Sequence, residues 1–157
     1  MLLFLKNLLF TAVVPGTVAV YVPVFLFSHD PVQLSLNTLT GGLLLIIGCI
    51  IYLWCVWDFA FVGRGTPAPI DAPKNLVVRG LYRYTRNPMY VAVVGMIFGW
   101  AITFSALPIL IYGISMATFF HLFIVFYEEP YLRRTFGSTY VEYCLQVSRW
   151  LPFHHAS

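Results

Sequence analysis

Residues 87–127 read NPMYVAVVGMIFGWAITFSALPILIYGISMATFFHLFIVFY, and the fold of the chain follows from this stretch. It holds two apolar runs, Pro88 to about Ser105 and Pro108 to Tyr127. Each approaches the roughly 20 residues that a helix needs to cross a bilayer core of about 30 Å. Asn87-Pro88 is typical of an N-cap and first helical residue, because proline fixes φ and lacks a donor that the helix would waste. The pattern predicts an antiparallel pair of membrane-spanning helices.

Two further apolar runs precede this pair, Leu8–Phe27 and Leu39–Val62. The first is longer than the apolar region of a typical signal peptide, and no small-x-small cleavage site follows it. We therefore expect a retained span. The sequence predicts an all-α membrane protein with about four transmembrane helices in a single integral membrane domain, residues 1–157.

The composition agrees with a lipid environment. Of the 157 residues, 60% are hydrophobic and 10% are charged, whereas soluble domains carry about 25% charged residues. A net charge of +3 is too small to indicate a nucleic-acid partner. Cys49, Cys55 and Cys144 show neither metal-ligand nor disulfide spacing, so we interpret them as small core residues and expect no metal site.

The basic residues predict the orientation. All nine lie on one side of the predicted spans: Lys6, Arg64, Lys74, Arg79, Arg83, Arg86, Arg133, Arg134 and Arg149. By the positive-inside rule, both termini and the loop between the second and third spans are expected in the cytoplasm. A bacterial inner membrane or the endoplasmic reticulum would fit this topology.

The segment Tyr131–Trp150 is too polar to span a membrane. Its apolar residues recur at spacings of three and four, at Leu132, Phe136, Tyr140, Tyr143 and Val147. We expect a C-terminal amphipathic interfacial helix over the cytoplasmic end of the spans, with a break at Gly137.

Four charges near this cytoplasmic end oppose the helix dipoles. Arg83 and Arg86 stand at the N-terminus of the third span, and Glu128 and Glu129 at the C-terminus of the fourth. Each placement opposes a preference of about 0.3–1 kcal/mol, which favours a site for a ligand with an anionic and a cationic end. Alternatively, the arginines are topology anchors, and the glutamates pair with arginines four or five residues later on the same helix.

Three other features of the sequence have either a functional or a structural explanation. His121 in the fourth span is either functional or a neutral histidine bonded to a neighbouring helix. Asp58 would pair with Arg64 or another loop arginine. Gly95 and Gly99 form a small-xxx-small pair that close helix packing explains.

Two blocks of sequence resemble a known family. The first is KNLVVRGLYRYTRNPMY, residues 74–90; the second joins EEPYL (128–132), FGSTY (136–140), Tyr143 and RWLP (149–152). Their order, with one helical hairpin (88–127) between them, resembles isoprenylcysteine carboxyl methyltransferases, whose superfamily includes phospholipid and small-thiol methyltransferases. The resemblance covers residues 73–152, the expected cofactor-binding and catalytic region.

The resemblance implies an integral membrane methyltransferase that uses S-adenosylmethionine, bound in a cytoplasmic pocket that opens laterally to lipid. The residues it implies for the cofactor pocket are Leu76, Val77, Tyr82, Asn87, Tyr90 and Glu128. Those nearest the transferred methyl would be Arg86 and Glu129, with Tyr140 and Arg149 supporting the wall or the substrate.

The expected acceptor is lipophilic or membrane-partitioning, and a prenylcysteine-like carboxylate is favoured. A carboxylate is ionised at neutral pH and needs no base, whereas an amine or thiol would need Glu129 or a tyrosine to take its proton. Asn87 stands where the prenylcysteine branch has histidine, and asparagine cannot carry a proton. The alternatives of a different class are a non-catalytic membrane subunit, a small-solute carrier and a lipid-binding scaffold.

Overall fold

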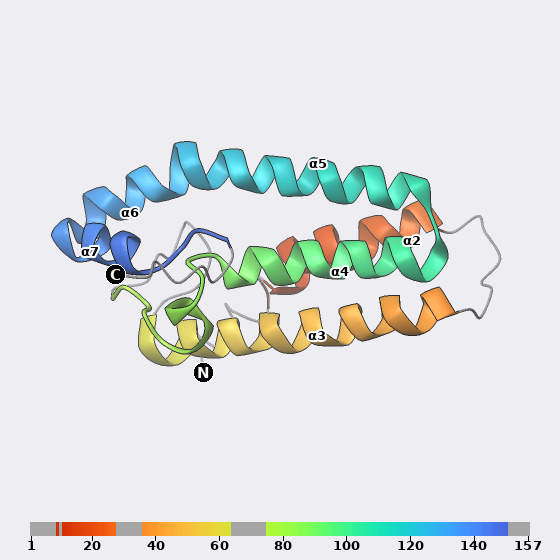
Figure 1. The fold of residues 1–157 in the computed structure, drawn as a ribbon, viewed down its shortest axis with the longest axis horizontal. Coiled ribbons are helices and arrows are strands. Elements are labelled where there is room, and N and C mark those ends of the chain that lie inside the picture. The colour runs from red at the N-terminus through yellow and green to blue at the C-terminus, as the bar shows by residue number, and fades with distance from the viewer. Residues whose placement is uncertain (1–8, 10, 28–35, 64–74, 151–157) are drawn as a thin grey trace.

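The computed structural model describes residue 9 and residues 11–27, 36–63 and 75–150, and the described residues form helices and no strands. Three long helices lie side by side: α3 (Leu36–Asp58), α4 (Pro88–Phe104) and α5 (Leu107–Phe123). Helix α4 lies between the other two (Figure 1). The all-helical class predicted from the sequence is therefore observed in this part of the chain.

Glycines bring α3 and α4 into close contact. A Cβ on Gly41 would lie 2.6 Å from the carbonyl oxygen of Gly99, and a Cβ on Gly48 would lie 2.6 Å from Cγ of Met96. No side chain larger than hydrogen fits at either position without a shift. Of the predicted small-residue pair, Gly99 packs against α3, whereas the Cβ position of Gly95 has open space.

A tight turn joins α4 to α5 as the sequence predicts. Helix α4 begins at Pro88 and ends before Ser105, which adopts the left-handed conformation with φ +50°. Ala106 donates its backbone N–H to the carbonyl of Ala101, and Pro108 follows in the first turn of α5. The two helices run antiparallel (Figure 1).

The first helix covers residues 11–27 and contains a π-helical turn, Thr17–Tyr21, followed by α2, Val22–Phe27. Two hydrogen bonds tie it to the bundle: Trp100 Nε1 donates to the carbonyl of Ala19 at 2.9 Å, and the Tyr112 hydroxyl donates to that of Val18 at 3.0 Å. The predicted start at Leu8 lies outside the described residues.

The fourth helix differs from its prediction. It does not end at Tyr127; it continues through a π-helical turn, Ile124–Glu128 (η5), into α6, Glu129–Phe136. Pro130 does not stop it, because proline is tolerated in a first turn and the π-turn precedes it. The predicted interfacial segment over residues 131–150 forms two helices, α6 and α7 (Ser138–Gln146), and the predicted break at Gly137 is observed, with φ +55°.

Two helical segments are long and apolar enough to cross a membrane, Leu36–Phe61 and Leu107–Phe136. Thr11–Leu26 and Pro88–Phe104 are apolar but shorter. Large apolar side chains are exposed along α3 and α5, as expected of surfaces that face lipid. Among the cysteines, Cys55 is buried, Cys144 is partly buried and Cys49 is exposed on α3, so the core interpretation was wrong for Cys49.

Candidate functional site

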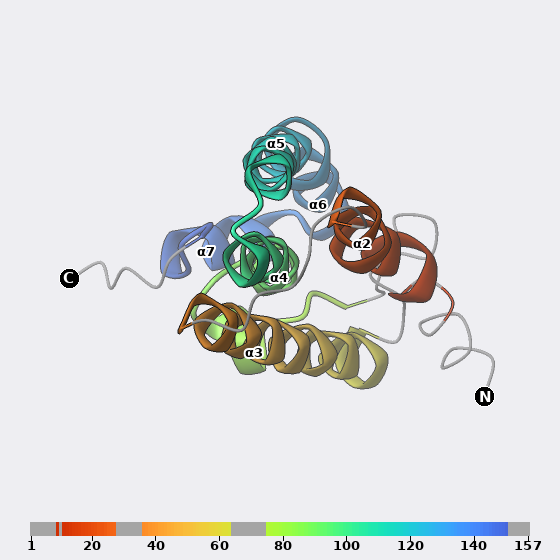
Figure 2. The same ribbon diagram turned by 90° about the vertical axis from the view of Figure 1, so that its right-hand side faces the viewer.

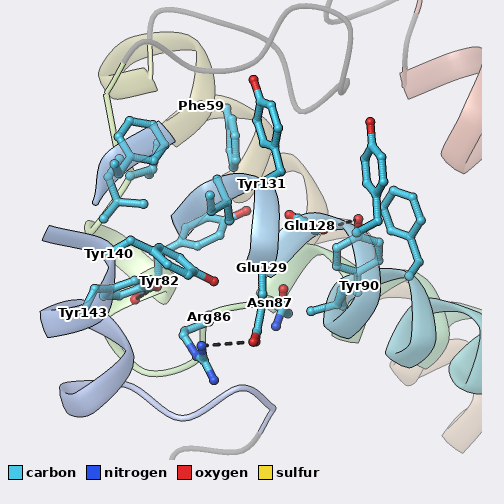
Figure 3. Close-up of a pocket in the computed structure, with 17 residues that line it drawn as sticks. Phe59, Tyr82, Arg86, Asn87, Tyr90, Glu128, Glu129, Tyr131, Tyr140 and Tyr143 are labelled. Atoms are coloured by element: carbon cyan, nitrogen blue, oxygen red, sulfur yellow. Dashed lines mark hydrogen bonds and ion pairs between the residues drawn. The ribbon is translucent and has the colours of Figure 1, made fainter. Parts of the chain in front are cut away.

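A cleft of about 850 Å³, its open mouth included, lies at the end of the bundle where α6 and α7 meet α4 (Figure 3). The cleft is lined by Phe59, Leu76, Val77, Tyr82, Arg86, Asn87, Tyr90, Phe123, Ile124, Tyr127, Glu128, Glu129, Tyr131, Leu132, Phe136, Tyr140 and Tyr143. Both sequence blocks singled out above contribute to it.

A short 3₁₀ turn, Gly80–Arg83, presents Tyr82 to the cleft. Gly80 has φ +55°, and a Cβ there would lie 2.3 Å from Oδ2 of Asp58, so the turn requires glycine. The Tyr143 hydroxyl donates to the Tyr82 carbonyl at 2.7 Å and joins the turn to α7. Asp58 is buried, and no described arginine pairs with it; Arg64, its predicted partner, lies outside the described residues.

The segment after α7 crosses the N-terminus of α4. The Arg149 carbonyl accepts hydrogen bonds from Asn87 Nδ2 at 3.0 Å and Thr85 Oγ1 at 3.1 Å, and the Ser148 carbonyl accepts one from the Arg86 N–H at 2.9 Å. Asn87 occupies the predicted N-cap position of α4. Its side chain makes no capping hydrogen bond to the described part of the helix and instead donates to the carbonyl of Arg149. The backbone of residues 148–149 thus connects the two sequence blocks.

Glu129 is the centre of an ion-pair network. Its carboxylate accepts two hydrogen bonds from Arg149, Nε at 2.7 Å and Nη2 at 3.0 Å, and Arg86 Nη1 lies 3.1 Å from Oε1. The hydrogen bond to Glu129 raises the pKa of Arg149. Glu129 is buried, so these partners also compensate its loss of water. The alternative pairing with arginines later in α6 is not observed.

Glu128 has different surroundings. It is partly buried and accepts a hydrogen bond from the Tyr90 hydroxyl at 2.7 Å. Within the part of the chain that the structure describes, no basic side chain pairs with it. A partly buried carboxylate with no cationic partner is a favourable place for the cationic part of a ligand.

The guanidinium of Arg86 has a nitrogen donor that no described residue binds. Its Nη1 also donates to Cys144 Sγ at 2.7 Å, but its buried Nε has no partner among the described residues. The guanidinium lines the cleft, with 11% of its side chain exposed. Unused donors on a positive group favour an anionic ligand group beside it.

The tyrosines of the cleft wall are hydrogen-bond donors and not bases. Burial raises the pKa of Tyr82, Tyr140 and Tyr143 above the ordinary value of a phenol. Each therefore keeps its proton at neutral pH. A base in this cleft would have to be a carboxylate.

The structure places all the predicted site residues in or beside the cleft. Nine of them line it, and Arg149 stands behind Glu129. His121, which carried two readings, is exposed and accepts a hydrogen bond from Trp150 Nε1 at 3.2 Å. The wall residues Phe59, Phe123 and Tyr127 were not singled out from the sequence. The spacing of Phe123 and Tyr127 could have indicated two of them, because residues four apart lie on one face of a helix, just before Glu128.

Comparison with known proteins identifies the family. A family model described as phospholipid methyltransferase matches residues 36–139, about two thirds of the chain. The chain therefore belongs to the phospholipid methyltransferase family; Tyr140 and Arg149 lie beyond the matched residues. No curated protein and no solved structure was found that matches the chain.

Proposed function

We propose that this member of the phospholipid methyltransferase family transfers a methyl group from S-adenosylmethionine to the carboxylate of a lipophilic acceptor, in the cleft between α4, α6 and α7. Methyltransferases of the family generally use this cofactor, and the family suggests a lipid-related substrate. The observation that carries the proposal is that one cleft holds both a carboxylate, Glu128, with no ion-pair partner among the described residues, and a guanidinium, Arg86, whose Nε has no described partner.

The residues of the cleft fit the cofactor. S-adenosylmethionine has an ammonium and a sulfonium, which Glu128 would attract, and a carboxylate, which the free N–H groups at the start of α4 would bind. The aromatic lining, including Tyr90 and Phe123, offers apolar surface to the remaining part of the molecule. Among the described residues no group of three metal-ligating side chains occurs.

The reaction requires little of the protein besides positioning. Bound S-adenosylmethionine supplies an electrophilic methyl on a positively charged sulfur. Arg86 would orient the acceptor carboxylate with its guanidinium, and the apolar wall would exclude water. A C–S bond breaks and a C–O bond forms between the methyl and the carboxylate oxygen, so no proton has to move.

Glu129 would position Arg86 and would not act as a base. Its carboxylate is bound by two guanidinium groups, which stabilise its charged form and lower its basicity. If the acceptor is instead an amine, as a phospholipid headgroup would provide, Glu128 is the better base, because it has one neutral hydrogen-bond partner. The amine is therefore the second candidate.

The first test is calorimetric titration of the detergent-purified protein with S-adenosylhomocysteine. Micromolar binding, about −8 kcal/mol, is expected in the wild type and in Glu142→Gln, an exposed control on α7. Glu128→Gln should bind much more weakly, because the cleft then lacks the carboxylate that would attract the ammonium of the ligand. No binding by a folded wild-type protein would reject the proposal and favour a non-catalytic membrane subunit or lipid-binding scaffold.

The second test identifies the acceptor. With a radiolabelled methyl donor, N-acetyl-S-farnesylcysteine should be methylated, whereas its methyl ester, which lacks the free carboxylate, should not. Labelling of phosphatidylethanolamine in place of the prenylcysteine would instead support the amine acceptor.

A further inference from the structure

The two helices α6 and α7, joined at Gly137, form an elbow at the end of the bundle. The fourth helix runs 30 residues from Leu107 to Phe136, about 45 Å at 1.5 Å per residue. A bilayer core of about 30 Å accommodates roughly 20 of these residues. Tyr127 lies about 20 residues after Leu107, the first residue of α5. If Leu107 lies at one boundary of the bilayer core, α6 therefore lies at the level of the lipid headgroups on the other side.

Helix α7 lies across the end of the bundle. Seen along the bundle, α5 appears end-on while α7 appears side-on and extends beyond α4 (Figure 2). A helix in this position lies across the direction of α5, which belongs to a segment long and apolar enough to cross a bilayer. This is the orientation of an interfacial helix.

The inner side of α7 is packed, and one outer flank is apolar. Tyr140 and Tyr143 are buried against the rest of the elbow. Val141 and Leu145, four residues apart and therefore on one flank, are 42% and 74% exposed. Glu142 is exposed and borders this flank, because it lies three residues before Leu145.

The preceding helix, α6, ends in two exposed arginines. Arg133 and Arg134 are in the last turn of α6, and neither pairs with a described carboxylate. Basic side chains at headgroup level next to exposed apolar residues complement a negatively charged lipid surface.

We propose that the outer face of the α6–α7 elbow, formed by Arg133, Arg134, Val141 and Leu145, binds anionic lipid headgroups and thereby orders one wall of the cleft. The elbow supplies Glu129 and Tyr140 to the cleft and leads into Arg149. Lipid bound outside would therefore tighten the cleft inside. The cleft half of this inference rests on the proposed function; the lipid-binding half does not.

The test uses the full chain in nanodiscs of phosphatidylcholine alone or mixed equally with phosphatidylglycerol. Hydrogen exchange of the backbone amides of residues 138–146 should be slower in the anionic discs. Arg133→Gln with Arg134→Gln should remove the difference, with exchange up to about thirty-fold faster than in the wild type. The matched double variant Arg79→Gln with Arg83→Gln removes two exposed charges from the 3₁₀ turn and its flank, and should retain the difference.

Leu145→Ser tests the apolar part of the surface separately from its two arginines. It should weaken the protection while leaving α7 folded, since Leu145 is mostly exposed. Equal exchange in both discs, or loss of the difference in the Arg79 and Arg83 double variant, would overturn the lipid-binding surface.

Affinity for S-adenosylhomocysteine in the same discs tests the cleft. Tighter binding in anionic discs, lost with the Arg133 and Arg134 double variant, supports the coupling, and equal affinity overturns it. Lipid-dependent protection without any binding of S-adenosylhomocysteine would support the surface and reject the proposed function.

Discussion

At the scale of single residues, the network around Glu129 explains why Arg86 and Arg149 are arginines. Arg149 binds both carboxylate oxygens, and Arg86 shares one of them while Nε stays free. Lysine would supply the charge but neither the planar fork nor a second donor for the cleft. The geometry of the guanidinium is thus as important as its charge.

Arg86→Lys tests this distinction. We expect methyl transfer to fall roughly 10–100-fold, the equivalent of one charge-assisted hydrogen bond, because lysine cannot hold Glu129 and an acceptor carboxylate together. Affinity for S-adenosylhomocysteine should change less. Initial rates with a labelled methyl donor measure the effect, and Arg83→Lys, exposed on the 3₁₀ turn, is the control. Unchanged rates in Arg86→Lys would reduce Arg86 to a topology anchor.

The buried tyrosines predict a loss of stability in alkali. Burial raises the pKa of Tyr143 in the folded protein above the value near 10 of an unfolded chain. The stability that its neutral phenol contributes is complete below about pH 10 and is lost as the pH rises further, because the unfolded state releases the proton first. The melting temperature should therefore fall as the pH rises above about 10.

Tyr143→Phe should make that drop smaller, while the lost bond to the Tyr82 carbonyl costs about 1 kcal/mol at neutral pH. Thermal unfolding in detergent at neutral pH measures the cost of the lost hydrogen bond. The same measurement in alkali, above about pH 10, measures the alkaline drop. Tyr84→Phe, at an exposed tyrosine, should behave as the wild type. An equal alkaline drop in Tyr143→Phe and the wild type would show that Tyr143 does not titrate in this way.

At the scale of elements, the π-helical turn Ile124–Glu128 sets the direction of the two glutamates. A π-turn accommodates one residue more than an α-helical turn. Without it, everything after the turn would be rotated by about 100° relative to α5. Glu129 would then no longer face Arg86 and Arg149. Such turns often mark functional sites, and here the turn itself lines the cleft through Ile124, Tyr127 and Glu128.

Two single-residue deletions test the role of this turn. Deletion of Phe126, which is 75% exposed within the π-turn, should convert it to an α-helical turn and keep α6 facing the cleft. Most of the affinity for S-adenosylhomocysteine should remain. Deletion of Ile114, exposed in the regular part of α5, should rotate the rest of the helix by about 100° and abolish binding. A folded Phe126 deletion without affinity would contradict this account.

At the scale of the whole molecule, the sequence predicts the helices better than their ends. Apolar length and the Asn87-Pro88 pair predicted α4, and Pro108 predicted the start of α5 within a residue. The end of the fourth helix was wrong because Glu128, Glu129 and Pro130 resemble a helix end locally. The contacts of Glu129 with Arg149 and Arg86, which the local sequence does not reveal, stabilise the continuation into α6.

The site was predictable as a set of residues but not as a network. The two sequence blocks contain thirteen of the seventeen residues that line the cleft, since their side chains carry the family resemblance. The bonds from Asn87 to the carbonyl of Arg149 and from Arg86 to the carbonyl of Ser148 involve backbone atoms, which every residue possesses. Sequence patterns carry no signal for such contacts.

The path of the chain through the membrane gives the last prediction. Helices α3 and α5 lie on opposite sides of α4 (Figure 2), and α4 connects the end of one to the start of the other. If both long helices cross the membrane, α4 must return across it. Its 17 residues span about 25 Å, and local thinning of the bilayer compensates the difference from a core of about 30 Å.

The basic residues predict that the cleft end faces the cytoplasm, because Arg79, Arg83, Arg133 and Arg134 all lie at that end of the helices. Alkaline phosphatase inserted after Ser105 should therefore be active outside a bacterial inner membrane, whereas green fluorescent protein fused after Ser157 should fluoresce inside. Phosphatase fused after Ser157 should be inactive and serves as the control. Activity after Ser157 with none after Ser105 would invert the topology. The cleft would then face a compartment that lacks S-adenosylmethionine, so this outcome would also reject the proposed function in such a cell.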